Sequence, residues 1–141
     1  MNPVRVLFIC TGNSARSQMC EALLRKHGGE MYQAFSAGLE PKGIHPLTKV
    51  VMEEIGIDMN SHSSKPLSKY MGKEHFDYVI TVCSHADESC PSVFPGAESR
   101  LHWDFEDPAA FNGTHEEKLR KFREVRELID ERIKAWLVRN N

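Results

Sequence analysis

The sequence predicts an α/β fold in which a mostly parallel sheet is covered by helices on both faces. Three observations carry this prediction. Short runs rich in β-branched and apolar residues are typical of buried strands, longer segments between them have apolar residues at helical spacing, and glycine or proline stands where those segments end. Because strands that alternate with helices pair in parallel, we expect a three-layer sandwich around a central four-stranded sheet.

Four segments have the composition of strands. The first is rich in β-branched and apolar residues and is followed directly by Thr-Gly-Asn. The second is closed by Gly38, the third reads DYVITVC, and the fourth is weaker. In chain order, the predicted strands are Val4–Ile9, Tyr32–Ala37, Asp77–Cys83 and Ser99–Trp103.

Three segments have the spacing of amphipathic helices. The first, Ser17–His27, is followed by a Gly-Gly pair that ends it. Pro46 suits the first turn of a second helix, which Gly56 terminates. In the last helix, Thr114 and Glu117 fit a capping box. The apolar face of this last helix consists of Phe122, Val125, Ile129, Ile133 and Trp136.

Length and composition limit the class of protein. The 141 residues, of which 40% are hydrophobic and 27% charged, fit one soluble globular domain over residues 1–141. A formal net charge of -2 gives no electrostatic basis for a nucleic-acid partner. Neither a membrane span nor a signal peptide is recognisable. We therefore expect a cytoplasmic protein, a monomer by default, without nucleic-acid or membrane partners.

The loop C-T-G-N-S-A-R joins the first strand to the first helix. Its small residues let backbone N–H groups turn inward, and the helix N-terminus adds partial positive charge. Arg16 offers a planar fork of donors to a tetrahedral oxyanion, and Cys10 stands at the base as a nucleophile whose thiolate these groups favour. In the alternative reading, Cys10 is a buried strand residue and Arg16 a surface charge. The predicted anion-binding residues are Thr11, Gly12, Asn13, Ser14, Ala15, Arg16 and Ser17.

The stretch VLFICTGNSARSQMCEALLR resembles the phosphate-binding loop of the low-molecular-weight protein tyrosine phosphatase superfamily. Within it, the chain is most similar to the thioredoxin-coupled arsenate reductases, through FSAGLEP, VITVCSHADESCP and HWDFEDPA. The resemblance implies a low-molecular-weight phosphatase-like fold and the reduction of arsenate to arsenite, in arsenic detoxification. Phosphate and sulfate would be analogues of the substrate.

The resemblance also implies a relay of three cysteines. Cys10 attacks arsenate, Cys83 attacks the Cys10–arsenic adduct, and Cys90 then attacks Cys83 and frees Cys10. Thioredoxin would regenerate the enzyme, with glutathione and glutaredoxin as the alternative reductant. In a regular helix, the seven-residue offset from Cys83 to Cys90 would separate their Cα atoms by about 10 Å, whereas a disulfide tolerates about 4.4–6.8 Å. We therefore expect the segment between them to unwind on oxidation.

The four cysteines also allow other readings. Cys83 could simply end a buried strand, with Cys90 incidental. A zinc site with His85 is a further alternative, although C-x6-C lacks the usual short ligand spacing. Cys20 lies on the apolar stripe of the first helix and is expected in the core. The seven histidines form no recognisable ligand set, so we predict no metal site.

The resemblance assigns the general acid to the aspartate of an Asp-Pro pair, here Asp107. Pro108 stiffens the loop and biases Asp107 toward an extended backbone. The neighbouring Asp104, Glu106 and His102 are weaker candidates. Alanines follow the Asp-Pro pair where the phosphatases usually have an aromatic residue, which suits a small inorganic anion.

Some of the reductases that the chain resembles hold potassium beside the loop, and Asn13, Glu21 and Ser36 match three of its ligands. Lys65 stands where the fourth, an aspartate, belongs, and its ammonium could replace the ion. We therefore expect no potassium site and no tightly bound cofactor. A solvated surface lysine is the alternative reading.

The sequence thus predicts an arsenate reductase with weak phosphatase side activity. A phosphatase that uses Cys10, Arg16 and Asp107 is the enzymatic alternative. A non-catalytic anion- or redox-sensing module is an alternative of a different class.

Overall fold

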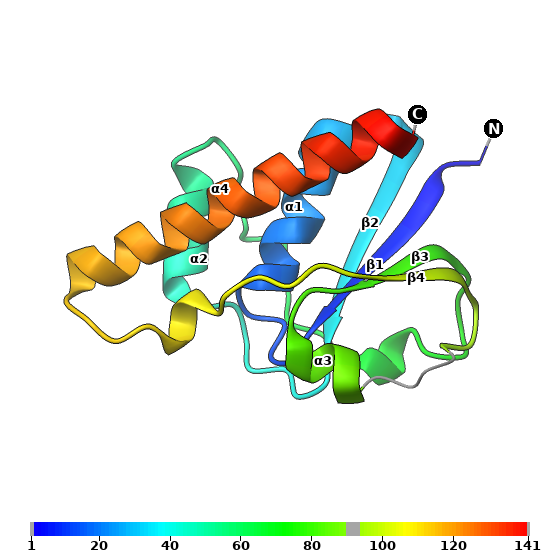
Figure 1. The fold of residues 1–141 in the computed structure, drawn as a ribbon, viewed down its shortest axis with the longest axis horizontal. Coiled ribbons are helices and arrows are strands. Elements are labelled where there is room, and N and C mark those ends of the chain that lie inside the picture. The colour runs from blue at the N-terminus through cyan, green and yellow to red at the C-terminus, as the bar shows by residue number, and fades with distance from the viewer. Residues whose placement is uncertain (1, 90–93, 141) are drawn as a thin grey trace.

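The computed structural model describes residues 2–89 and 94–140 and contains a central sheet of four parallel strands (Figure 1). The strand order is β2-β1-β3-β4, so the chain starts in the middle of the sheet and adds strands on both sides. The strands are β1 (Val4–Cys10), β2 (Tyr32–Gly38), β3 (Phe76–Thr81) and β4 (Ala97–His102). Each expected strand is present, and the predicted α/β class is confirmed.

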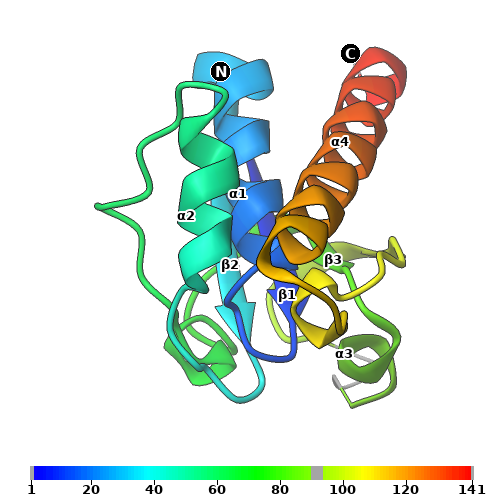
Figure 2. The same ribbon diagram turned by 90° about the vertical axis from the view of Figure 1, so that its left-hand side faces the viewer.

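Helices cover one face of the sheet in a continuous layer (Figures 1 and 2). They are α1 (Arg16–Gly28), α2 (Pro46–Glu53) and α4 (His115–Asn140). Trp136 of α4 packs edge-on against Tyr32 and Tyr78, which project from β2 and β3. This aromatic contact fixes the long helix to the sheet.

The opposite face of the sheet is covered by shorter elements. They include the 3-10 turn η2 (Leu67–Lys69), after which Tyr70 packs edge-on against Phe35 and Phe76. The small helix α3 (Ser84–Ser89) follows β3 near the strands' carboxyl ends (Figure 1). The remaining 3-10 turns are η1 (Gly29–Met31) and η3 (Pro108–Ala110).

The ends of several elements differ from the expected ones for local reasons. β3 ends at Thr81 rather than Cys83, because the chain leaves the ladder there to enter α3. α2 ends at Glu53, and the turn that follows closes on Gly56 with a φ of 83°. The predicted capping box is confirmed. The Thr114 N–H donates to Glu117 at 2.9 Å, and the Glu117 N–H donates to the Thr114 hydroxyl at 3.2 Å.

Two consequences of this fold bear on function. The carboxyl ends of the neighbouring strands β1 and β3 meet at one edge, so Cys10 and Cys83 are brought together there. Among the described residues, the helices are too short or too polar to cross a membrane.

Candidate active site

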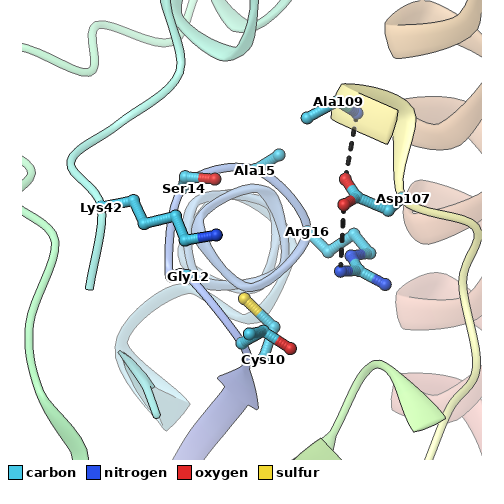
Figure 3. Close-up of a pocket in the computed structure, with 9 residues that line it drawn as sticks. Cys10, Gly12, Ser14, Ala15, Arg16, Lys42, Asp107 and Ala109 are labelled. Atoms are coloured by element: carbon cyan, nitrogen blue, oxygen red, sulfur yellow. Dashed lines mark hydrogen bonds and ion pairs between the residues drawn. The ribbon is translucent and has the colours of Figure 1, made fainter. Parts of the chain in front are cut away.

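A pocket of about 300 Å³ opens where β1 ends and α1 begins (Figure 3). The loop between them wraps the N-terminus of α1, and side chains from two other segments close the rim. Its lining consists of Cys10, Thr11, Gly12, Ser14, Ala15, Arg16, Lys42, Asp107 and Ala109.

The loop is held from outside by the segment that follows β2. The carbonyl oxygens of the loop accept hydrogen bonds from the N–H groups of Glu40, Lys42 and His45 in that segment, at 2.8–3.0 Å. Because these carbonyl oxygens point away from the pocket, the N–H groups of the loop can face it, as an anion-binding nest requires. Gly38 is needed for this approach, because a Cβ at that position would lie 2.8 Å from both the Asn13 nitrogen and the Thr11 oxygen.

Asn13 is the residue that turns the loop. Its φ is 48°, a left-handed conformation that asparagine tolerates better than most residues, and its side chain is fully buried. The side-chain oxygen accepts hydrogen bonds from the Lys65 N–H at 2.8 Å and from Gln18 at 3.0 Å. The turn is therefore fixed by its own side chain.

Cys10 lies at the base of the pocket, 2% exposed. The Asn13 N–H donates to its sulfur at 3.2 Å, and the Ser17 hydroxyl lies 2.8 Å from it. Asn13 Nδ2 also donates to Ser17 Oγ at 2.8 Å. Because that contact makes Oγ an acceptor, the Ser17 proton is free to point at the sulfur. Both donors therefore suit a thiolate.

Arg16 and Asp107 stand on the opposite wall of the pocket from Lys42 (Figure 3). The Arg16 guanidinium donates to the Phe105 carbonyl at 3.1 Å and lies 3.6 Å from the Asp107 carboxylate. Asp107 also caps η3 by accepting the Ala109 N–H at 3.0 Å. An anion over Cys10 would therefore meet a guanidinium and a carboxyl group from one side.

Cys83 lies against the same loop. Its sulfur is 3.5 Å from the hydroxyl of Thr11, the residue after Cys10, and accepts the Ala86 N–H at 3.4 Å. It is buried, with 3% exposed. Cys90 falls outside the described residues, so its predicted role stays a prediction.

Lys65 lies in a buried polar cluster beneath the loop. Its ammonium is 3.7 Å from Glu21 and 3.4 Å from the Ser36 hydroxyl, which itself donates to Glu21 at 2.8 Å. His62 Nδ1 lies 2.9 Å from the other Glu21 oxygen. The reading of Lys65 as a solvated surface charge is wrong, since its side chain is only 12% exposed. The absence of a potassium site stays a prediction.

The charges of this cluster depend on one another. Burial would raise the pKa of Glu21, but the contacts with His62 and Ser36 and the charges of Lys65 and Arg25 outweigh it and hold that pKa below its usual range. Burial lowers the pKa of Lys65, and the Glu21 charge partly opposes that shift. A carboxylate beneath the loop is therefore favoured at neutral pH.

The other sequence candidates lie outside the pocket lining. Glu106 pairs with Lys121 at 3.3 Å, and His102 Nδ1 lies 2.9 Å from the Thr81 hydroxyl. Cys20 is fully buried in the core, as expected.

Sequence reasoning missed Lys42, whose side chain crosses the pocket mouth and whose stem lies over Gly12 (Figure 3). The available signal was its place after β2. Loops that follow parallel strands share the edge at which Cys10 lies.

A cysteine in an anion nest, with an arginine and an aspartate on one wall, defines a class of enzymes that attack tetrahedral oxyanions through sulfur. The family model of low molecular weight phosphotyrosine protein phosphatase matches residues 5–140, and the chain belongs to that family.

Relatives within the family are named for another reaction. The chain is 42% identical to an arsenate reductase of Halalkalibacterium halodurans over 136 residues, which cover 96% of both chains. A solved arsenate reductase in a phosphate-binding state is 31% identical with a TM-score of 0.77, over 96% of this chain and 98% of that one. A thioredoxin-dependent arsenate reductase of Corynebacterium glutamicum is also 31% identical, with a TM-score of 0.67, over 96% of this chain and 61% of that one.

Proposed function

We propose that the protein reduces arsenate to arsenite, with Cys10 as the nucleophile and Cys83 and Cys90 as the thiols that carry the oxidation away. The observation that carries this proposal is the second thiol at the pocket. Cys83 Sγ lies 3.5 Å from the hydroxyl of Thr11, the residue after Cys10. A phosphatase needs one sulfur because water removes the group that it takes, whereas reduction needs two thiols. The arsenate reductases among the relatives support the same choice.

The reaction begins at arsenic. The Cys10 thiolate attacks arsenate and displaces one oxygen, which leaves as water when protonated. The Cys83 thiolate then attacks Cys10 Sγ, the sulfur–arsenic bond breaks, and its electron pair stays on arsenic. Arsenic thereby gains the two electrons that the two sulfurs lose, and arsenite leaves a Cys10–Cys83 disulfide behind. Attack by Cys90 on Cys83 restores Cys10 and leaves a Cys83–Cys90 disulfide.

The remaining site residues hold and protonate the anion. The Arg16 guanidinium and the backbone amides around the N-terminus of α1 bind the oxygens of the anion. The other proposed anion-binding residues are Thr11, Gly12, Asn13, Ser14, Ala15 and Ser17. Asp107 supplies the proton to the leaving oxygen, and its position 3.6 Å from Arg16 supports that role. Phosphate and sulfate have the same tetrahedral shape and would compete for this nest.

Thioredoxin is the proposed reductant, because the final disulfide is intramolecular and a dithiol partner can open it in one exchange sequence. The thioredoxin dependence of the Corynebacterium glutamicum relative favours it over glutathione and glutaredoxin. We further propose a monomeric single domain over residues 1–141 that acts in the reducing cytoplasm, with no cofactor tightly bound at the site of the reaction. Size-exclusion chromatography with light scattering tests the monomer.

The direct test is arsenate-dependent oxidation of NADPH with thioredoxin and thioredoxin reductase, repeated with glutathione, glutaredoxin and glutathione reductase. We expect sustained turnover with the first system. Turnover with the second system alone would reject thioredoxin as the reductant but leave arsenate reduction standing. Turnover with neither would contradict the proposed activity.

A variant isolates the relay. Cys90→Ser should complete a single turnover, release one arsenite per chain and remain trapped as the Cys10–Cys83 disulfide, which peptide mapping without reductant detects. Sustained turnover by this variant at the wild-type rate would remove Cys90 from the mechanism.

Phosphatase activity is the second candidate, and family membership favours it. The nest that receives arsenate would also receive the phosphoryl group of an ester, and Cys10 with Asp107 could transfer it to water. We propose it as a weak side activity. Hydrolysis of p-nitrophenyl phosphate should depend on Cys10 and be indifferent to Cys90→Ser, so that variant separates the two activities.

A further inference from the structure

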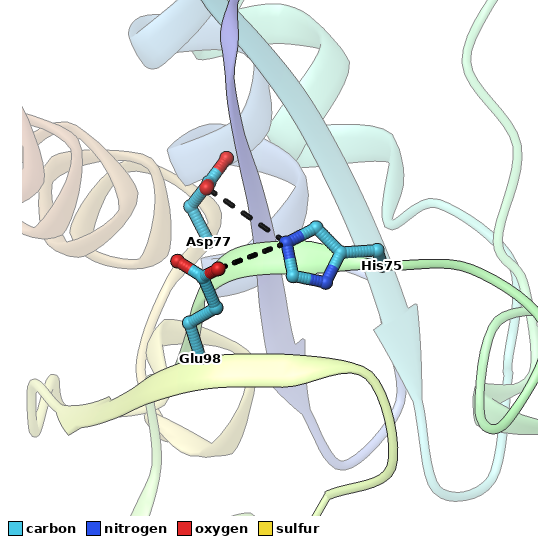
Figure 4. A group of neighbouring side chains, drawn as sticks. All are labelled: His75, Asp77 and Glu98. Carbon is cyan, nitrogen blue, oxygen red and sulfur yellow. Dashed lines mark ion pairs between the residues drawn. The ribbon is translucent and has the colours of Figure 1, made fainter.

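Three polar side chains meet at the end of the sheet opposite the anion pocket. His75 directly precedes β3, Asp77 is the second residue of β3, and Glu98 is the second residue of β4. One donor atom from each lies within 4.8 Å of the other two (Figure 4). Both carboxylates face the imidazole ring (Figure 4). Neither the fold nor the proposed reaction accounts for this cluster, which we call the His75 cluster.

The spacing in the His75 cluster is too wide for hydrogen bonds. His75 Nε2 lies 3.5 Å from Glu98 and 3.9 Å from Asp77. A hydrogen bond between nitrogen and oxygen needs about 2.7–3.2 Å. By contrast, ligands bound to one tetrahedral ion at about 2.0–2.2 Å are separated by about 3.3–3.6 Å from each other. The His75 nitrogen and the Glu98 oxygen already stand at such a separation. Rotations of the exposed His75 and Glu98 side chains would bring the Asp77 oxygen, which lies 3.9 Å from the nitrogen, into the same range.

The backbone places two acidic residues side by side. Phe76 pairs with Ala97 and Tyr78 with Ser99 in the ladder between β3 and β4, so Asp77 and Glu98 occupy the same level of the sheet. Like charges opposite one another on neighbouring strands destabilise the pair. A cation bound between the two carboxylates would offset that repulsion.

One of the ligands is already oriented. The Arg5 N–H donates to Asp77 Oδ2 at 2.7 Å, while Asp77 Oδ1 is the oxygen that faces His75. The Arg5 guanidinium turns away to the His75 carbonyl and Glu74, so its charge is engaged outside the cluster. Hydrogen bonds to the non-ligating atoms of a metal ligand fix its direction and strengthen the site.

We propose that His75, Asp77 and Glu98 bind a divalent transition-metal ion of the zinc class. One imidazole nitrogen and two carboxylate oxygens suit zinc, and a water molecule would complete four ligands. The site goes beyond the proposed reaction. β1 spans seven residues from this edge to Cys10, so roughly 20 Å of strand separates the ion from the anion pocket.

Isothermal titration calorimetry with Zn²⁺ tests the site in the full-length chain. The cysteines would also bind zinc, so the titration uses a Cys10→Ser, Cys83→Ser, Cys90→Ser background. We expect one ion per chain and at least a tenfold loss of affinity in His75→Ala, with a smaller loss in Glu98→Gln. His115→Ala, which removes an exposed histidine at the start of α4, is the matched control and should change nothing. Equal affinity in His75→Ala and the background would overturn the site.

A second measurement avoids the triple substitution. In ¹⁵N-labelled reduced wild-type protein, two equivalents of Zn²⁺ should shift the backbone amide signals of 75–77 and 97–99 as well as those around the thiols. His75→Ala should abolish the first set of shifts and keep the second. Shifts confined to the thiol region in the wild type would reject the His75 cluster as a metal site.

Discussion

The two connections that leave the carboxyl ends of β1 and β3 differ in how firmly they are held. The first leads from Cys10 into α1, which has 13 residues, eight of them buried. The loop of this connection forms hydrogen bonds with the segment after β2, with Gln18 and with the backbone N–H of Lys65. The second leads from Cys83 into α3, which has only six residues.

The sulfurs of Cys10 and Cys83 differ in the same way in how closely their hydrogen-bond partners approach. Cys10 has two donors, the Ser17 hydroxyl in the first turn of α1 at 2.8 Å and the Asn13 N–H of the loop at 3.2 Å. Cys83 has longer contacts, at 3.4 and 3.5 Å, one of them to α3 and the other to that loop. A receptor for a tetrahedral anion must be preorganised, because its dipoles act only if they need not reorient. A thiol that passes an oxidation onward must instead be able to move.

The largest expected effect comes from removing the sulfur of Cys10, which the firmly held loop positions. We expect Cys10→Ser to lower arsenate reduction at least a thousandfold, because a hydroxyl is a far weaker nucleophile. The coupled NADPH assay measures it. Cys20→Ala is the matched control. Burial and the nearby Cys10 raise the pKa of the Cys20 thiol, so that thiol stays neutral and its loss should leave the activity within about threefold.

The next largest effect concerns the wall of the pocket. Asp107→Asn keeps the shape of the side chain but removes the proton donor, and we expect kcat to fall by about a hundredfold. Glu106→Gln changes the neighbouring carboxylate, which pairs with Lys121 away from the pocket, and should leave kcat unchanged. Equal losses in both variants would mean that the effect is one of surface charge.

The stability of the rigid loop should depend on pH through Glu21. Its pKa is lowered in the folded protein, so the stabilisation is complete above its unfolded pKa and is lost as pH falls through the lowered value. Urea unfolding at pH 7 should show Glu21→Gln less stable by about 2 kcal/mol, since Lys65 loses its buried partner. The difference in the free energy of unfolding between the wild type and Glu21→Gln should become smaller below about pH 4.5. A constant gap from pH 7 to pH 3.5 would contradict the assignment.

The connection through α3 can be tested by hydrogen exchange. We expect the amides of 84–89 to exchange at least tenfold faster in the Cys83–Cys90 disulfide form than in the reduced form, because closing that bond must shorten the helix. The buried amides of α1 serve as the internal reference and should not change. Equal protection of 84–89 in both forms would show that the segment oxidises without unwinding.

The smallest expected effect is that of potassium. With Lys65 beside Glu21 and Ser36, replacing sodium by potassium at constant ionic strength should change kcat/KM less than twofold. In Lys65→Asp the carboxylate adds oxygen ligands at the same place, and a potassium response should appear. A steep potassium response in the wild type would show that an ion binds despite the ammonium.

Much of the fold could be predicted because its signals are local. The capping box at Thr114 and Glu117 depends on residues three apart, and the apolar stripe of α4 on the helical period. Strand ends were harder. The third strand was predicted through Cys83, but the apolar pattern of Val82 and Cys83 reflects burial outside the ladder. Hydrophobic patterns report burial, and a chain leaving a sheet can stay buried.

The sequence by itself determined the parallel α/β fold and the loop of small residues between Cys10 and Arg16, because both depend on the order of residues within short stretches. Only the tertiary structure decided which distant groups join them. Lys42 at the pocket mouth, Cys83 against Thr11 and Lys65 beside Glu21 come from segments far apart in the chain. The His75 cluster likewise needed the register between β3 and β4. Contacts between segments depend on packing and register, which residue order alone does not specify.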